Sequence, residues 1–146
     1  MTFWQMAGIN DKMHNTLRYV FSEVFMKSSQ FEQACTLFNT QEFFEAHEVW
    51  EDLWNEAQGE RHAYLQGLIQ VAAALVHAKR GNWRGVHKLF ASALQYLERG
   101  RSSASLGEVD PAALREKVLD FELSVQEVEA GKMDSETLVF FQLPRL

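Results

Sequence analysis

Residues 62–78 most constrain the fold, because they form a run without formal charge when the histidines are neutral. Wound as a helix, the run carries apolar side chains on two flanks, so it must be covered on nearly all sides. A bilayer crossing needs roughly 20 apolar residues, and this run is shorter and contains glutamines, so we predict no membrane span. We expect instead the central helix of a bundle. Its flanks consist of Leu65, Ile69, Ala72 and Val76 on one side and of Tyr64, Leu68, Val71 and Leu75 on the other.

Helical periodicity also marks the segments on both sides of this run. We therefore predict an all-α fold, a compact bundle of about five helices with antiparallel helix pairs, in a single domain over residues 1–146. The apolar tail from Asp134 onward is expected to be extended and packed on the bundle, because exposing it would favour association. The expected helices cover residues 11–27, 30–38, 40–57, 62–78, 83–99 and 110–130, of which 30–38 is the shortest.

Three polar residues are predicted to cap the first turns of these helices. Asn39, followed three residues later by Glu42, resembles a capping box that opens the helix at 40–57. Asn82 is typical of an N-cap for the helix that follows the central one. Asp110 precedes Pro111, and proline is favoured at the first position of a helix.

The helix that precedes the central one places an imidazole and a carboxylate inside an aromatic stripe. At 100° per residue, His47 and Glu51 lie one turn apart and share an arc with Phe43, Trp50 and Trp54. We therefore expect the His47–Glu51 pair to point into the core and the opposite side to be an acidic, solvated face. That face gathers Glu45, Glu48, Asp52 and Glu56.

The central helix carries a second polar stripe. Gln66, Gln70 and His77 fall within about 40° of one another on helical geometry. Because a buried polar group without a partner costs several kcal/mol, the two stripes should face each other. We therefore predict a semi-buried polar pocket between the two helices. It would be formed by His47, Glu51, Trp54, Gln66, Gln70 and His77, with Trp50 and Tyr64 as its aromatic lining.

Three interpretations of this pocket stay open. It can be a structural hydrogen-bond network, a binding site for a small polar ligand, or a catalytic or metal site. Glu51 stands where a zincin has its second histidine, and Phe44 stands where a ferritin-like motif has its glutamate. A mixed site of His47, Glu51 and His77 remains open. We predict a non-enzymatic binding or interaction module without cofactor or assigned metal; the alternative is a metal-dependent or acid/base hydrolase that uses His47 and Glu51.

Charge and cysteine content limit the partners. The net charge of −6 argues against general nucleic-acid binding, which calls for a basic surface. Cys35 is the one cysteine of the chain and no charged-then-apolar signal segment precedes it, so we expect a small buried thiol and a cytoplasmic setting. A basic cluster that faces the acidic helix of a second subunit would make a homo-oligomer. The cluster consists of Lys79, Arg80, Arg84, Lys88, Arg99 and Arg101.

Two blocks of this sequence resemble a known family. The segment 43–54 is similar to a signature of His, three residues, Glu, two residues and Trp, matched here by His47, Glu51 and Trp54. The segment 64–82 follows in the same order. Together they resemble domain of unknown function 309, a family of small all-helical bacterial, archaeal and plant proteins, over about residues 31–97. The resemblance implies a compact helical bundle and no particular activity.

Overall fold

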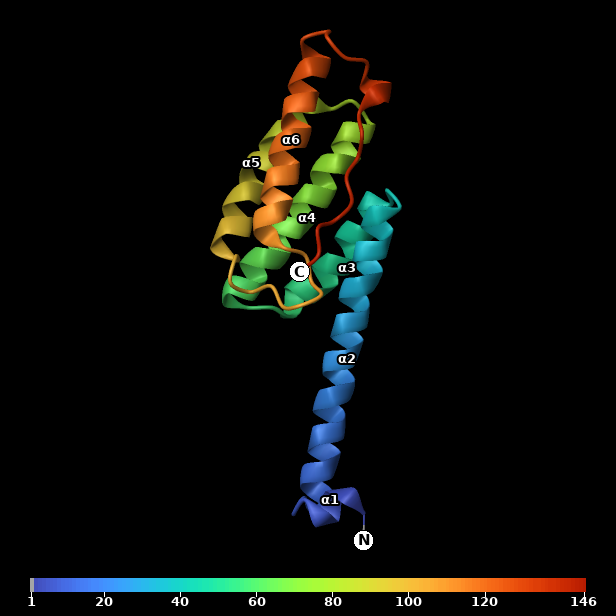
Figure 1. The fold of residues 1–146 in the computed structure, drawn as a ribbon, viewed down its shortest axis with the longest axis vertical. Coiled ribbons are helices and arrows are strands. Elements are labelled where there is room, and N and C mark those ends of the chain that lie inside the picture. The colour runs from blue at the N-terminus through green and yellow to red at the C-terminus, as the bar shows by residue number, and fades with distance from the viewer. Residues whose placement is uncertain (1) are drawn as a thin grey trace.

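The computed structural model describes residues 2–146 and contains only helices as regular elements (Figure 1). Within this part of the chain there is no β-strand, and one isolated bridge joins Val109 and Arg145. The predicted all-α fold is confirmed. Its elements are α1 (Phe3–Met6), α2 (Asp11–Asn39), α3 (Phe43–Glu56), α4 (Gly59–Lys79), α5 (Trp83–Arg99), α6 (Pro111–Glu129) and the 3-10 helix η1 (Ser135–Thr137).

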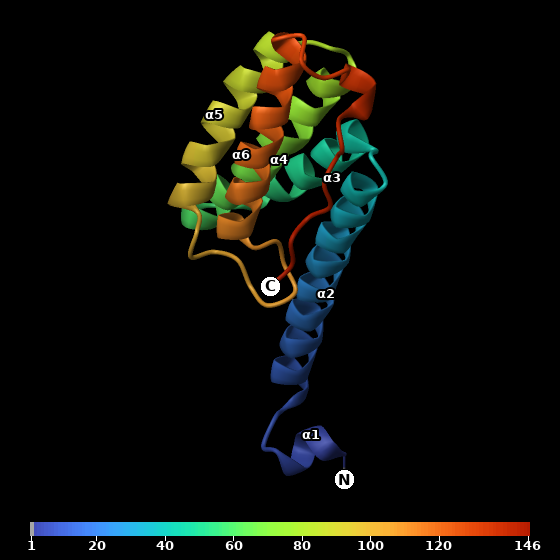
Figure 2. The same ribbon diagram turned by 45° about the horizontal axis from the view of Figure 1, so that its top comes forward.

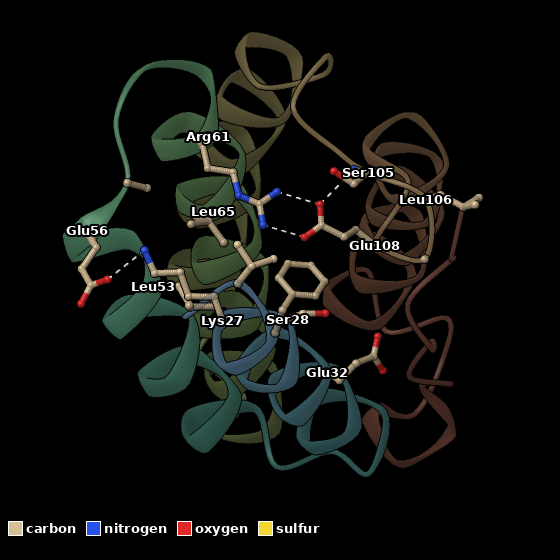
Figure 3. A pocket seen from close by; sticks show the side chains of 14 residues that line it. Lys27, Ser28, Glu32, Leu53, Glu56, Arg61, Leu65, Ser105, Leu106 and Glu108 are labelled. Atoms are coloured by element: carbon tan, nitrogen blue, oxygen red, sulfur yellow. Dashed lines mark hydrogen bonds and ion pairs between the residues drawn. The ribbon is translucent and has the colours of Figure 1, made fainter. Parts of the chain in front are cut away.

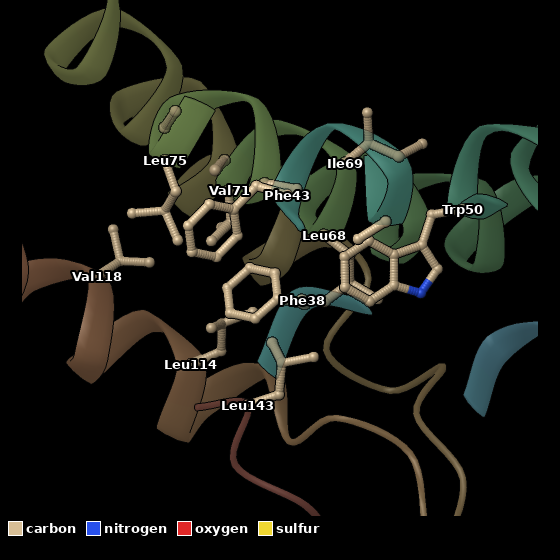
Figure 4. Packing of buried hydrophobic residues seen from close by; sticks show 14 of the residues in the cluster. Phe38, Phe43, Trp50, Leu68, Ile69, Val71, Leu75, Leu114, Val118 and Leu143 are labelled. Atoms are coloured by element: carbon tan, nitrogen blue, oxygen red, sulfur yellow. The ribbon is translucent and has the colours of Figure 1, made fainter. Parts of the chain in front are cut away.

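The helix α4 lies at the centre of the bundle, as its apolar flanks predict. It packs against α3 on one side and α5 on the other, while α2 covers α3 and α6 covers α5. Leu68 and Leu75 of α4 are 1% exposed or less, and Trp50 of α3 is completely buried (Figure 4). The first turns of α4 and the end of α5 pass very close to each other, since a Cβ on Gly100 would lie 2.4 Å from the backbone N of Tyr64. None of the helices in residues 2–146 combines the length and apolarity needed to cross a membrane.

Two of the three predicted caps are confirmed. The Asn82 side chain accepts a hydrogen bond from the backbone N–H of Gly85 at 3.2 Å. Asp110 accepts one from the N–H of Ala112 at 3.1 Å, and Pro111 opens α6. These contacts satisfy backbone donors that a first helical turn leaves unpaired.

The prediction for Asn39 is wrong. Asn39 is the last residue of α2, and its Oδ1 accepts a hydrogen bond from the backbone N–H of Leu143 at 2.8 Å. Glu42 holds the N-cap position of α3 without a side-chain capping bond, and its carboxylate accepts instead from the hydroxyl of Thr40 at 2.7 Å. A tertiary contact with the C-terminal tail therefore takes the place of the expected local capping box.

The helix α2 is continuous, whereas two helices at 11–27 and 30–38 were predicted. The residues between the two expected helices are Ser28 and Ser29, neither of which stops a helix as glycine or proline does. The second half of α2 lies on the bundle, where Phe31 and Phe38 are buried. Its first half projects beyond the bundle and carries α1 at its far end (Figures 1 and 2).

After the 3-10 helix η1, residues 138–144 of the C-terminal tail are extended and lie on the bundle. The ring of Phe140 lies 5.5 Å from that of Phe43, and the ring of Phe141 lies 5.8 Å from that of Phe38. The backbone N–H of Asp110 donates to the carbonyl of Pro144 at 2.9 Å. The tail thus ties α2 and α3 to the segment that precedes α6.

Candidate functional site

The polar pair of α3 lies at the rim of the bundle. His47 Nε2 is 3.7 Å from Glu51 Oε2, with side-chain exposures of 26% and 49%. Glu51 therefore does not point into the core as expected. The buried side of α3 is centred on Ala46 and Trp50, so the helical phase puts His47 at its edge and Glu51 outside it. The expected acidic outer face of α3 is confirmed, because Glu45, Glu48, Asp52 and Glu56 are all exposed.

The helices α3 and α4 run antiparallel, and an aromatic contact sets their register. The ring of Trp54 stacks on that of His62 with centroids 4.2 Å apart. Since both helices rise equally per residue, His47, seven residues before Trp54, comes level with Ile69 and Gln70 of α4.

Several polar atoms on α3 and α4 are buried without a hydrogen-bond partner among residues 2–146. They are Nδ1 of His47, the indole Nε1 atoms of Trp50 and Trp54, and Oε1 of Gln70. The indoles are donors only, and the amide oxygen accepts only. The closed hydrogen-bond network predicted between the stripes is therefore not formed at these atoms. Gln66 is half-buried on the same helix as Gln70.

Two of the predicted site residues lie elsewhere. His77 contacts the start of α5, with its Nδ1 3.0 Å from the side-chain N of Asn82. Tyr64 is completely buried, and its hydroxyl donates to the carbonyl of Val109 at 2.8 Å. Burial and the nearby Glu108 carboxylate raise the Tyr64 pKa well above its usual range. Both residues hold helices together.

The proposed metal constellation does not assemble. Within residues 2–146, no group of three or more His, Cys, Asp or Glu side chains is close enough to hold a metal ion. The mixed site of His47, Glu51 and His77 is therefore not formed, and His77 contacts Asn82 at the start of α5 instead.

A cavity of about 520 Å³ lies at a place that the sequence did not indicate. It opens where α2 leaves the bundle, between α2, the end of α3, the start of α4 and the segment 105–108 (Figure 3). Arg61 and Glu108 close one side through two hydrogen bonds of 2.7 and 2.6 Å. Burial alone would raise the pKa of Glu108, but hydrogen bonds from Arg61 and Ser105 outweigh it and lower that pKa. Apolar Leu53 and Leu65 also line the cavity.

His87 is a second feature that the sequence did not reveal. Its Nδ1 hydrogen-bonds Glu122 and its Nε2 hydrogen-bonds Glu129, which joins α5 to α6. Desolvation lowers the pKa of His87, but the two carboxylates outweigh it, so the pKa is raised. The two glutamates are seven residues apart on one face of α6, a signal that becomes useful only once α5 and α6 are known to be neighbours.

Comparison with known proteins adds a family and a relative. Residues 31–89 match the model of the family described as "Domain of unknown function (DUF309)". The chain is also 34% identical over 95 residues to the "Uncharacterized protein YpuF" of Bacillus subtilis (strain 168), a match that covers 64% of this chain and 54% of that protein. The chain thus spans about half the length of this relative. From the second half of α2 into α5, the chain is therefore similar to DUF309 proteins, and the resemblance inferred from the sequence is confirmed.

Proposed function

We propose that this protein is a non-enzymatic binding module that takes a small polar ligand at the contact between α3 and α4. The observation that carries the proposal is the set of buried, unpaired polar atoms on His47, Trp50, Trp54 and Gln70. Leaving such atoms unpaired costs roughly 1–3 kcal/mol each, and binding can recover this cost. Cys35 is a free cysteine that is 1% exposed, and the absence of a disulfide among the described residues supports a cytoplasmic setting for this function.

The donor and acceptor pattern suggests the chemistry of the ligand. Two indole N–H groups and an imidazole can donate to a carboxylate or carbonyl, and the amide oxygen of Gln70 can accept from an N–H group. Glu51, exposed beside His47, can hold a positive charge at the rim. A small molecule that carries both a carboxylate and an amino group fits this pattern.

Indole signals provide the test, because the chain has four tryptophans and the site uses two of them. We would record the ¹⁵N-¹H indole resonances of the protein while adding free amino acids and their amides at millimolar concentration. We expect the signals of Trp50 and Trp54 to shift with saturation, while those of Trp4 and Trp83 stay in place. If no compound shifts the two site indoles, or all four move together, the proposal is wrong.

A hydrolase that uses His47 and Glu51 is the second candidate. It is supported by the contact of 3.7 Å between the two side chains and by the partial exposure of the imidazole, which leaves it open to a substrate. Purified protein should then hydrolyse activated ester or phosphate substrates, and His47→Ala should abolish the activity. Turnover that is unchanged in this variant would rule the hydrolase out.

A further inference from the structure

The second half of α2 packs on the bundle through an apolar stripe, and this stripe continues along the projecting first half of the helix. Phe31, Cys35 and Phe38 face the bundle and are at most 2% exposed. At 100° per residue, the same arc contains five apolar residues nearer the N-terminus. These form the arm stripe, which consists of Met13, Leu17, Val20, Phe21 and Val24. Phe21 is 64% exposed and Val24 60%, so this part of the stripe lacks a cover within the chain.

The uncovered area is large enough for a stable interface. With Phe25 on α2 and Phe3 and Met6 on α1, each more than 70% exposed, the arm stripe presents on the order of 1,000 Å² of apolar residue surface. The largest apolar patch on a monomer is roughly 300–600 Å², whereas a standard interface buries about 800 Å² on each partner. A surface of this size is typical of a subunit contact.

A second copy of the chain fits this surface best, because the stripe is self-complementary about its middle. Two such helices placed antiparallel, with the two-fold axis between Val20 and Phe21, bring Leu17 of one copy level with Val24 of the other. Val20 likewise meets Phe21, whereas Met13 comes level with Ser28. The same register brings the N-terminal end of one arm level with residues 28–31 of the other copy.

The cavity of about 520 Å³ lies at that height, on the same face of α2. Val24, Ser28 and Phe31 line its wall, so the cavity is continuous with the arm stripe (Figure 3). The short helix α1 is held at the tip of the arm, where the ring of Trp4 lies 4.8 Å from that of His14. Its exposed Phe3 and Met6 therefore arrive at the cavity of the second copy.

We propose that the protein forms a two-fold dimer in which the arms, residues 3–28, pack antiparallel and α1 of each copy enters the cavity of the other. This dimer differs from one that joins the acidic and basic faces of two subunits. An apolar interface is insensitive to salt, whereas contacts between charged surfaces weaken as salt rises.

Sedimentation and light scattering on the full chain test the dimer. The chain has a mass of 16.8 kDa, and we expect twice this mass at low and at high salt. Phe21→Glu and Val24→Glu should reduce the mass to that of one chain. Tyr19→Glu is the matched control, because Tyr19 is 71% exposed on the opposite side of α2 and should leave the dimer intact. All three sites are exposed on the arm, so far-ultraviolet circular dichroism should report the same helical bundle in each variant.

Three results would overturn the dimer. The first is a wild-type protein that stays monomeric at the highest soluble concentration. The second is a dimer that persists in both Phe21→Glu and Val24→Glu, or that dissociates equally in the control Tyr19→Glu. The third is a dimer that dissociates as salt rises, which would assign the contact to the charged faces. A wild-type monomer that binds phosphatidylcholine vesicles through Phe21 would identify a membrane surface as the occupant and likewise refute a second copy.

Cross-linking tests the position of α1. A short bis-maleimide should join Met6→Cys in one copy to Leu106→Cys in another, since Leu106 lines the cavity and is 93% exposed. Val139→Cys, 83% exposed on the tail, is the control and should not be linked to Met6→Cys. Equal linking at both positions, or none at Leu106 in a confirmed dimer, would show that α1 does not enter the cavity.

Discussion

The hydroxyl of Tyr64 links the central helix to the segment before α6, and removing it should destabilise the protein by a defined amount. Tyr64 and Val109 are both completely buried, and the hydroxyl donates to the Val109 carbonyl at 2.8 Å. Tyr64→Phe leaves that carbonyl without a partner, and an orphaned buried group of this kind costs about 1–2 kcal/mol. For a chain of this length we expect the melting temperature to fall by roughly 3–6 °C.

Urea unfolding followed by circular dichroism measures the effect. The midpoint should fall while the slope with denaturant stays unchanged, because the same surface is exposed on unfolding. Tyr19→Phe is the control, since Tyr19 is 71% exposed and its hydroxyl faces solvent. A loss below about 0.3 kcal/mol in Tyr64→Phe would refute the role assigned to this hydrogen bond.

Three further changes test other contacts. The pKa of His87 is raised in the folded protein, so its ion pairs stabilise the fold below the unfolded pKa, and this contribution is lost as pH rises through the folded pKa. The difference in melting temperature between wild type and His87→Gln should therefore be largest near about pH 6 and shrink at higher pH. A difference that stays constant with pH would contradict this role of His87. Gly100→Ala should cost roughly 1–3 kcal/mol in urea unfolding, because the added Cβ would lie 2.4 Å from the backbone of Tyr64; an unchanged midpoint would refute the close contact. Burial raises the pKa of Cys35 to about 12, so a maleimide should react with it only after denaturation, and rapid labelling of the folded protein would contradict this.

Residue patterning predicts much of the bundle because the helices that form it have strongly periodic apolar faces. The central position of α4 follows from apolar side chains on both of its flanks, and the starts of α5 and α6 follow from Asn82 and Asp110. Two helices were predicted in place of the continuous α2 because Ser28 and Ser29 interrupt its apolar residues, although neither serine stops a helix. The role of Asn39 was missed because the amide that it binds belongs to Leu143, far away in the sequence.

The candidate site is predicted only in part, for a related reason. Helical phase places His47, Trp50 and Trp54 in one arc, but it does not fix the centre of the buried side of α3, which lies far enough from Glu51 to leave that side chain exposed. His77 shares a face with Gln70, yet its imidazole contacts Asn82 at the start of α5. The cavity beside α2 is formed by four separate segments, and no local pattern indicates how such segments meet.

The central claim is that the polar atoms between α3 and α4 are retained for binding and not for folding. Replacement of Gln70 by leucine tests this claim most directly, because the Gln70 amide oxygen is buried without a partner in the folded protein. We expect Gln70→Leu to leave the free energy of unfolding unchanged or to raise it by up to about 1 kcal/mol, while the ligand-induced shifts of the two site indoles disappear. A loss of stability of 1 kcal/mol or more, as expected for a member of a structural hydrogen-bond network, would contradict the account.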